Sequence, residues 1–294
     1  MTHVAVTGAN GMTGSHMVSL LKSEGFLVNS VTRNVWDLTE WKSFDEMDYI
    51  FKNVSAVFHF GAQLPNNNLT HDNLKTKQIF DANTRSCLNL AEWAKFKGIP
   101  IIFLSSSTIY KNPNASQITE ADLKVGTQFG GFYAYSKILA EDIFSYLSLD
   151  GLKSIVFRPS SLYGYGLPSN KFVQNCLNIA STGGEINITQ ARNKINFVHA
   201  HDVAYAALQA YKSKSWGVFN IASKENHSIL EVAEFAVSIL GKGKINILND
   251  NKEEINITRF NLDCELAKKS FGFKPKIQLK EGMSLMIDKL RNPK

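Results

Sequence analysis

The N-terminal segment places a glycine-rich turn between an apolar run and a helix-like stretch. The run His3–Thr7 has the composition of a buried strand, and residues 13–23 carry apolar side chains at the spacing of an amphipathic helix. Between them, Gly8, Gly11 and Gly14 follow the pattern G-x-x-G-x-x-G. Glycine permits a tight turn and a close approach of the backbone to a pyrophosphate, and the N–H groups at a helix N-terminus attract anions. This order of strand, turn and helix predicts a dinucleotide-binding fold.

The first half of the chain alternates short apolar runs with segments of helical period. Such alternation predicts parallel strands buried between two layers of helices. The expected strands are 3–7, 27–32, 56–60, 100–104 and 153–157, and the expected helices are 13–23, 79–96, 133–149, 171–180, 203–212 and 229–240. We therefore expect a Rossmann-type, doubly wound α/β fold in residues 1–160. Residues 161–294, where glycine-rich loops interrupt the pattern, are expected to form a smaller α/β substrate-binding domain partly interleaved with the first.

Composition and charge exclude several classes of protein. The chain has a formal net charge of +6, but its basic residues are scattered rather than gathered in the stripe of a nucleic-acid binder. No apolar run approaches the ~18 residues that span a bilayer, and no export signal precedes the first strand. Cys87, Cys176 and Cys264 lie far apart in the sequence and fit neither a metal site nor a disulfide framework. We therefore expect a cytoplasmic protein that binds neither nucleic acid nor membrane.

The end of the second strand bears on the choice of cofactor. An NAD site usually has Asp or Glu there to hold the ribose 2′-hydroxyl. In this chain Thr32 stands at that place and Arg33 follows. A guanidinium pairs with a 2′-phosphate, so NADP(H) is favoured and NAD(H) stays possible. Alternatively, Arg33 caps the sheet edge and stacks on adenine. Asp37 and Leu38 lie one loop further on, where they could reach the adenine amino group.

Tyr133 and Lys137 stand four residues apart in an expected helix. Residues at this spacing share a helix face. A free phenol loses its proton near pH ~10, and a neighbouring ammonium lowers that pKa toward a useful range. Such pairs are common on helix surfaces, so this one gains meaning from the glycine turn upstream. Tyr135 is two residues from Lys137 and is expected to face away from it.

Further motifs follow the glycine turn in a fixed order. They are His59-Phe-Gly-Ala62, Asn83, Leu104-Ser-Ser-Ser-Thr-Ile-Tyr110, Phe157-Arg-Pro-Ser-Ser-Leu-Tyr-Gly164, Phe197-Val-His-Ala-His-Asp-Val203, Asn220 and Leu262-Asp263. Over most of its length, the chain thereby resembles extended short-chain dehydrogenases/reductases of the NAD-dependent epimerase/dehydratase type. Members of that family act on nucleotide sugars.

The resemblance implies a catalytic set of Ser106, Tyr133 and Lys137, with Ser107 the alternative to Ser106. Tyr133 would exchange a proton with the sugar oxygen, Lys137 would lower its pKa and hold the nicotinamide ribose, and the serine would stabilise developing charge. The implied cofactor contacts are Gly8, Asn10, Gly11, Met12, Gly14, Arg33, Asp37, Leu38, Gly61, Ala62, Asn83, Tyr133, Lys137 and Arg158. The implied substrate contacts are Gln63, Ser107, Thr108, Ser161 and Arg192, with Lys194 and Arg259 as other candidates for the diphosphate, and no metal is expected.

Two departures from the family pattern narrow the expected reaction. Dehydratases of the family carry Asp-Glu where this chain has Ser107 and Thr108, and 3,5-epimerase/reductases carry a Cys beside the catalytic serine. An NADP(H)-dependent 4-keto reductase of nucleotide sugars and an NAD-dependent 4-epimerase remain, and Arg33 favours the reductase. A catalytically idle NADP(H)-sensing protein is a remoter possibility, which the Ser106, Tyr133 and Lys137 set argues against. The family also implies a homodimer through a bundle of helices 79–96 and 133–149.

Overall fold

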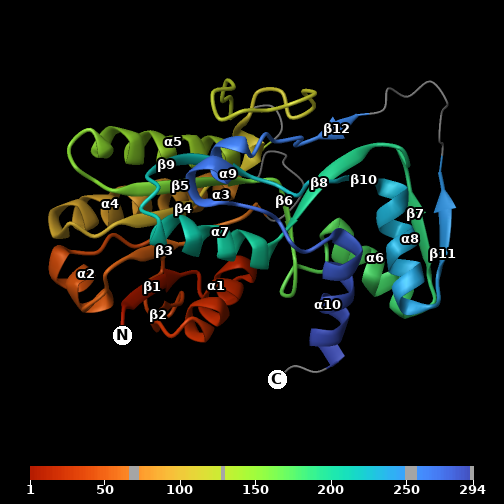
Figure 1. Ribbon diagram of the computed structural model, residues 1–294, viewed down its shortest axis with the longest axis horizontal. Coiled ribbons are helices and arrows are strands. Elements are labelled where there is room, and N and C mark those ends of the chain that lie inside the picture. Colours follow the sequence, from red (N-terminus) through yellow and green to blue (C-terminus); the bar gives the residue numbers. More distant parts are fainter. Residues whose placement is uncertain (66–72, 127–129, 249–256, 292–294) are drawn as a thin grey trace.

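A parallel sheet forms the centre of the computed structural model, which describes residues 1–65, 73–126, 130–248 and 257–291. Within these ranges, six strands pair in the order β2-β1-β3-β4-β5-β9 (Figure 1). They are β1 (His3–Thr7), β2 (Leu27–Val31), β3 (Val57–His59), β4 (Ile101–Leu104), β5 (Ser154–Pro159) and β9 (Gly217–Ile221). Strand β2 lies on one side of β1, and β3 and the later strands lie on the other side. The carboxyl ends of β1 and β3 therefore flank the switch point at which such sheets bind ligands.

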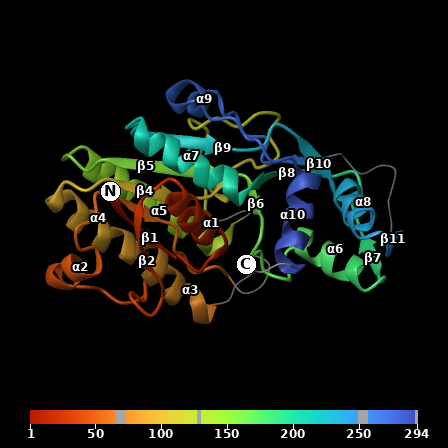
Figure 2. The same cartoon turned by 60° about the horizontal axis from the view of Figure 1, so that its bottom comes forward.

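Helices cover both faces of this sheet, as expected for a Rossmann-type α/β fold (Figures 1 and 2). Side chains alternate along β4, since Ile101 and Phe103 enter one apolar cluster while Ile102 and Leu104 enter the other. The first cluster includes residues of α2 (Phe44–Ile50), α4 (Ser86–Lys97) and α5 (Gly131–Ser148). The second includes residues of α1 (Met12–Ser23), α7 (Ala200–Lys212) and α9 (Glu265–Phe271). Burial on both faces explains why β4 is continuously apolar.

Two segments beyond residue 160 return to this layer. Helix α7 packs beside α1 (Figure 2), and β9 pairs in parallel with β5, with Gly217 opposite Ile155. The apolar pattern alone did not predict β9, because the strand begins at a glycine and carries Asn220 in its second half. The asparagine is fully buried and its side chain donates to the Ile118 carbonyl, so a hydrogen bond replaces the apolar signal.

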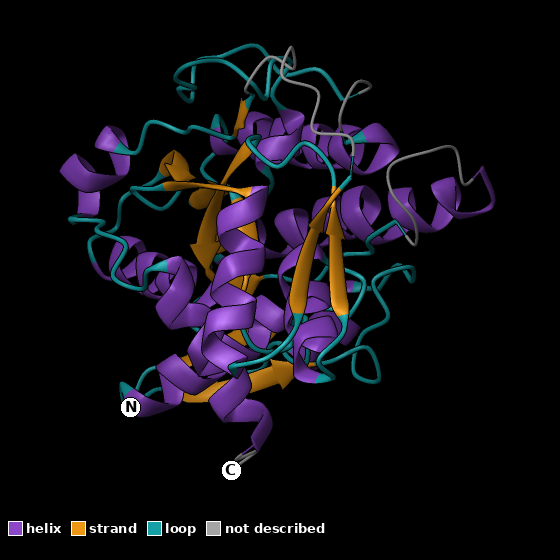
Figure 3. Cartoon of the chain, turned by 90° about the vertical axis from the view of Figure 1, so that its right-hand side faces the viewer, coloured by secondary structure: helices purple, strands orange, loops and turns teal. Residues whose placement is uncertain are grey.

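The rest of the second half forms its own packing unit. Strands β6 (Ser161–Tyr163), β8 (Lys194–His199), β10 (Asn226–Ser228) and β12 (Thr258–Arg259) make one sheet, and β7 (Glu185–Ile188) pairs with β11 (Lys244–Ile247). Figure 3 faces this end of the molecule and shows strands and helices packed together. The helices are α6 (Phe172–Ser181), α8 (Ile229–Leu240) and α10 (Leu279–Arg291). Leu177, Val232 and Met283 bring α6, α8 and α10 into one apolar cluster. No helix in the described ranges is long and apolar enough to cross a membrane.

The expected helix 79–96 is wrong in its start and its continuity. The structure has α3 (Asn73–Phe80), a π-helical turn η1 (Asp81–Arg85) and then α4. A π turn inserts an extra residue, which rotates the side chains that follow, and such turns are frequent at functional sites. Here the turn carries Asn83, which contacts the loop after β3. A second short element, the 3₁₀ turn η2 (Ser107–Ile109), follows β4.

We predict that Gly8→Ala destabilises the fold more than Gly25→Ala. Both glycines have positive φ angles, 63° and 80°, so both alanines are strained by about 1–2 kcal/mol. A Cβ at Gly8 would also lie 2.6 Å from the Gly61 Cα, whereas a Cβ at Gly25 would meet nothing within 4 Å. Urea unfolding of the two variants measures the difference. Equal losses of stability in the two variants would show that the close approach of Gly8 to Gly61 does not restrict the side chain at position 8.

Candidate active site

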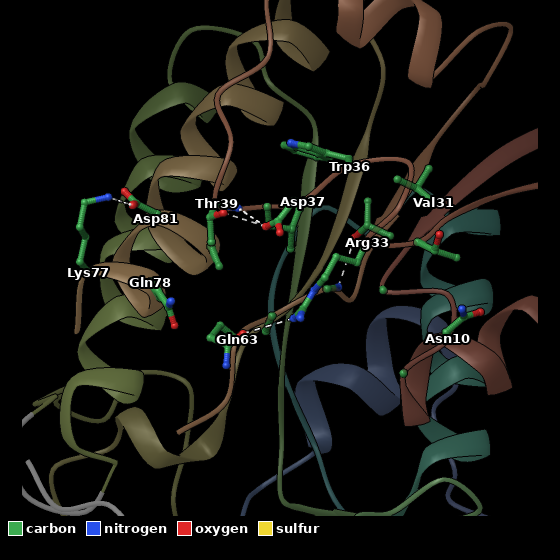
Figure 4. A pocket seen from close by; sticks show the side chains of 18 residues that line it. Asn10, Val31, Arg33, Trp36, Asp37, Thr39, Gln63, Lys77, Gln78 and Asp81 are labelled. Carbon is green, nitrogen blue, oxygen red and sulfur yellow. Dashed lines mark hydrogen bonds and ion pairs between the residues drawn. The ribbon is translucent and has the colours of Figure 1, made fainter. Parts of the chain in front are cut away.

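A cavity of about 620 Å³ opens at the carboxyl ends of β1, β2 and β3 (Figure 4). Nine residues predicted for the site line it: Gly8, Asn10, Gly11, Arg33, Asp37, Leu38, Gly61, Ala62 and Gln63. Nine further residues line it as well: Thr7, Val31, Thr32, Trp36, Thr39, Lys77, Gln78, Asp81 and Ala82. The cavity therefore gathers most of the cofactor contacts predicted from the sequence.

The hydroxyl of Thr7 connects the end of β1 to the loop after β3. Thr7 Oγ1 lies 2.8 Å from His59 Nδ1 and accepts a hydrogen bond from the Gly61 backbone N–H at 3.2 Å. Burial lowers the pKa of His59 to about 3, so its imidazole is neutral. Its Nδ1 then accepts the Thr7 proton, while Thr7 accepts from Gly61. This bond pattern holds the loop after β3 against Gly8, where an added Cβ would lie 2.6 Å from the Gly61 Cα.

The residues around the glycine turn fit a dinucleotide. Gly11 stands at the N-cap of α1 with no side-chain cap, so backbone N–H groups of the first turn remain for an anion. Gly14 passes the turn so closely that a Cβ would lie 2.0 Å from the Gly8 carbonyl oxygen. The bare backbone at Gly8 and Gly61, together with the cavity volume, leaves room for a pyrophosphate and its riboses. These features suit NAD(H) or NADP(H).

Gln63, expected to contact the substrate, lines the same cavity as the expected cofactor contacts. Figure 4 shows Arg33 and Gln63 pointing toward one another, and Arg33 Nη2 donates to Gln63 Oε1 at 3.3 Å. The Gln63 backbone makes two bonds with the Asn83 amide, at 2.7 and 3.0 Å. Asn83 also donates to Ser136 Oγ at 3.1 Å, and Ser136 donates to the Tyr133 carbonyl. A chain of hydrogen bonds thus joins the cavity to the helix that carries Tyr133.

The far end of the cavity is shaped by charged groups, some of which the sequence analysis missed. Asp37 Oδ1 accepts from the backbone N–H and hydroxyl of Thr39, and these bonds hold the pKa of Asp37 below its usual range. Asp81 pairs with Lys77 at 2.7 Å and with Arg85 at 3.2 Å. The i, i+4 spacing of Lys77, Asp81 and Arg85 in the sequence could have indicated these two ion pairs. The pairs were not predicted because the expected helix began only at residue 79.

Tyr133 and Lys137 lie on adjacent turns of α5. Lys137 Nζ is 5.8 Å from the centroid of the Tyr133 ring and donates to the Leu104 carbonyl at 2.8 Å. Burial lowers the pKa of Lys137 to about 8. Burial raises the pKa of Tyr133 to about 12, opposed by Ser106 and not by Lys137, so the lowering expected from the sequence is not found. Tyr135 is 43% exposed, so the phenol beside Lys137 is that of Tyr133.

Ser106 follows the end of β4 and lies near Tyr133. Its Oγ accepts the backbone N–H of Thr108 at 3.2 Å and lies 2.8 Å from Thr108 Oγ1. Ser106 is close enough to Tyr133 to act on the pKa of its phenol, whereas Ser107 is buried within η2. The structure thus brings Ser106, Tyr133 and Lys137 together.

Arg158 lies apart from the cofactor cavity. Its side chain is buried, and the residue is only 4% exposed. It donates to Glu141 through Nε at 3.0 Å and Nη2 at 2.7 Å, and through Nη1 to Tyr110 Oη at 3.0 Å and the Glu120 carbonyl at 2.9 Å. Ser105 also donates to Glu141. The structure therefore places Arg158 in the packing of α5 against β5, and the cofactor contact expected for it stays a prediction.

The predicted substrate contacts fall in different places. Ser161 is half-buried on β6, opposite Phe197 of β8. Arg192 is exposed and lines a cavity of about 470 Å³ that Lys194 also lines. Lys194 and Arg259 line a cavity of about 500 Å³ together with Phe172, Asn187, Ile188, Thr189, Gln190, Asn193, Ile195 and Ile229. The pairing of β12 with β8 brings these two basic residues together, although they are far apart in sequence.

The motif that contains His199 and His201 forms the start of helix α7. His199 Nδ1 accepts from the His201 backbone N–H at 3.2 Å and so caps α7. Its ring lies edge-on to His16, with centroids 5.3 Å apart. Across the described ranges, no group of three or more His, Cys, Asp or Glu side chains could hold a metal ion.

Comparison with known proteins gives consistent matches. The model of the NAD dependent epimerase/dehydratase family matches residues 4–222. The chain is 28% identical to dTDP-4-dehydro-6-deoxy-D-allose reductase of a Streptomyces species, over 81% of each chain. It is 26% identical to UDP-glucuronate 4-epimerase of Thermodesulfobacterium geofontis, over 98% of this chain and 96% of the other. Its fold matches UDP-glucose 4-epimerase of Thermus thermophilus in complex with NAD, with a TM-score of 0.80, 21% identity and 99% coverage of both chains.

We predict that Arg158→Met destabilises the protein by about 3–5 kcal/mol, because it removes the buried and closest cationic partner of the Glu141 carboxylate and leaves only Lys124 at 3.5 Å. The double variant Arg158→Met/Glu141→Leu should recover much of this loss. Lys268→Met, which breaks an exposed pair with Glu265, is the matched control and should cost far less. Urea unfolding measures all three. A loss at Arg158 no larger than at Lys268 would contradict a structural role for the buried pair.

Proposed function

Because the chain belongs to the NAD dependent epimerase/dehydratase family, we propose that it reduces a 4-keto nucleotide sugar with NADP(H). The observation that carries this proposal is Arg33, which points into the cofactor cavity from the end of β2, where Thr32 replaces the usual carboxylate. A guanidinium there suits a 2′-phosphate. The similarity to a dTDP-4-keto sugar reductase over 81% of the chain supports the same reaction.

The proposed mechanism uses three side chains. A bound nicotinamide supplies hydride to the carbonyl carbon. Tyr133 donates its proton to the carbonyl oxygen, and Ser106 donates a hydrogen bond that stabilises the charge developing there. Proton loss leaves a phenolate, which the Lys137 ammonium beside the ring stabilises. Solvent then returns the proton to Tyr133.

We assign binding of the nucleotide sugar to residues 161–294. Lys194 shares one cavity with Arg259 and another with Arg192, so these three basic residues are the candidates for the diphosphate. Ser107 and Thr108 provide no carboxyl pair beside Ser106, so the site lacks the groups that would eliminate water after oxidation. The proposed reaction therefore ends with a hydroxyl at the reduced carbon.

A 4-epimerase that recycles NAD is the second candidate. It is favoured by the similarity to UDP-glucuronate 4-epimerase, which extends over 98% of this chain. The same Ser106, Tyr133 and Lys137 would serve both reactions. The candidates differ in whether reduced cofactor is consumed, and that difference is measurable.

We predict that the protein oxidises NADPH when given a dTDP-4-keto-6-deoxyhexose, and that Tyr133→Phe lowers kcat by about 10²–10⁴-fold because the proton donor is lost. The decrease in reduced-nicotinamide absorbance measures this. Tyr135→Phe, on the same helix but exposed, is the matched control and should keep wild-type turnover. Interconversion of UDP-glucose or UDP-glucuronate without NADPH oxidation would favour the epimerase. Unchanged turnover in Tyr133→Phe would refute the catalytic assignment.

We predict that Arg33→Ala raises the KM for NADPH by about 10–100-fold and leaves the KM for NADH nearly unchanged, because only NADPH offers a phosphate to the guanidinium. Steady-state kinetics with the two cofactors measure this. Lys52→Ala, which removes an exposed cation elsewhere, is the control for net charge. Equal losses with both cofactors would mean that Arg33 stacks on adenine and does not read the phosphate.

A further inference from the structure

We propose that Phe103 is a positioning residue that holds the ammonium of Lys137 against the face of its aromatic ring. The inference rests on the proposed function, since it deepens the role of Lys137 in that reaction. Phe103 is otherwise a core residue of β4, fully buried in the apolar cluster that includes residues of α5. Three observations carry the inference: the distance between ring and ammonium, the lack of an unpaired anion around the ammonium, and the contacts that fix the ring.

The ring of Phe103 lies within the range of a cation–π interaction with Lys137. Nζ of the lysine is over the face of this ring, 4.6 Å from its centroid, and 5.8 Å from the centroid of the Tyr133 ring. A cation within about 6 Å of a ring centroid is attracted by the negative face of the ring, and more strongly where water is excluded. Phe103 is fully buried and Lys137 is only 3% exposed, so water screens little of this attraction.

The titratable groups around this ammonium, within the described ranges, offer it no unpaired anion. The carboxylate of Glu141, on the same face of α5, is already paired with Arg158 at 2.7 Å. The thiol of Cys87 on α4 stays protonated because burial raises its pKa to about 12. The imidazole of His59 on β3 is neutral, since burial lowers its pKa to about 3. The phenol of Tyr133 is neutral before proton transfer, because burial raises its pKa as well.

A carbonyl and a ring from one strand therefore hold the ammonium. Lys137 Nζ donates to the Leu104 carbonyl at 2.8 Å. Leu104 follows Phe103 on β4, so the backbone and the ring reach the same nitrogen from one strand end. Burial lowers the pKa of Lys137 to about 8, and the ring opposes this fall because its face favours the charged form. The lysine thereby stays charged where it faces Tyr133.

Neighbouring rings fix the plane of Phe103. His59 stacks on it, with ring centroids 5.9 Å apart and planes 18° apart. Phe144 of α5 lies 4.8 Å away, with its plane turned by 50°. The imidazole of His59 is itself held, since its Nδ1 lies 2.8 Å from Thr7 Oγ1. The ring that faces the ammonium is thus fixed from β3 and from α5.

The test weakens the face of the ring and keeps its shape. Replacing Phe103 by mono-, di- and trifluorinated phenylalanine withdraws electron density from the face in steps. The same series at Phe144 is the matched control, because that ring belongs to the same cluster but is not found over the ammonium in the described ranges. A weaker face disfavours the charged form, so the pKa of Lys137 should fall stepwise in the Phe103 series, by roughly half to one pH unit at the end. It should stay in place in the Phe144 series.

An NMR titration measures this without substrate. With the lysine Cε carbons isotope-labelled, the Lys137 resonance is assigned by its loss in Lys137→Met, and its chemical shift follows protonation as the pH rises. A stepwise fall confined to the Phe103 series is the expected result. An unchanged or raised pKa in that series, or equal falls in both series, would show that the ring of Phe103 serves packing only.

Turnover of a dTDP-4-keto-6-deoxyhexose with NADPH gives a second measurement. A neutral Lys137 cannot stabilise the phenolate of Tyr133, so the alkaline limb of kcat should move to lower pH together with the NMR titration of the Phe103 series. The plateau of kcat at lower pH should stay nearly unchanged, because there the lysine is charged in every variant. A ring with a packing role only would lower the plateau and leave the limb in place.

The outcomes separate this inference from the proposed function. If no 4-keto sugar is reduced, or if Tyr133→Phe keeps full turnover, the function proposal fails, and the NMR titration still decides the role of Phe103. If the sugar is reduced but the limb and the titration stay in place across the Phe103 series, the function proposal stands and the inference is wrong.

Discussion

The buried ion pair between Arg158 and Glu141 fixes the helix on which the chemistry depends. Tyr133, Lys137 and Glu141 occupy successive turns of α5 at i, i+4 and i+8, so they share one face. Glu141 is held from β5 by the guanidinium and from the end of β4 by Ser105, next to Ser106. A buried carboxylate requires its partner, so the helix cannot rotate or slide without exposing an unpaired charge. The phenol and the serine are thereby kept in register.

The cofactor cavity is coupled to this helix through polar contacts rather than apolar ones. The route passes from the loop after β3 through Asn83 to Ser136 on α5. Asn83 is buried, and its amide is satisfied by the Gln63 backbone and Ser136 together, which leaves little freedom for any of the three. The π turn η1 makes this geometry possible because it rotates Asn83 out of the regular helical ladder. A regular helix of the same sequence would present a different residue to the loop.

The sequence predicted the local parts of this site and missed the parts made by distant pairings. The glycine turn, the Tyr133 and Lys137 spacing and the first five strands follow from short-range pattern, because each motif lies within about twenty residues. Arg158 was predicted as a cofactor contact from its motif, which gives its neighbours in sequence but not the buried pairing with Glu141 that the structure adds. Lys194 and Arg259 meet only through the pairing of β8 with β12. A register set by tertiary packing has no signal in either segment alone.

Burial shifts the pKa values of both Tyr133 and Lys137. Burial disfavours the phenolate and the ammonium alike, so the pKa of Tyr133 rises while that of Lys137 falls. Before proton transfer, Lys137 faces a neutral phenol and gains little from it. After transfer it faces a phenolate, and the two charges compensate each other in a site of low dielectric. In the proposed reaction, the lysine would therefore stabilise the charged state more than the resting state, which is the condition for it to accelerate that reaction. Ser106 acts in the same sense, because a hydroxyl donor strengthens its bond as negative charge grows on the oxygen that it faces.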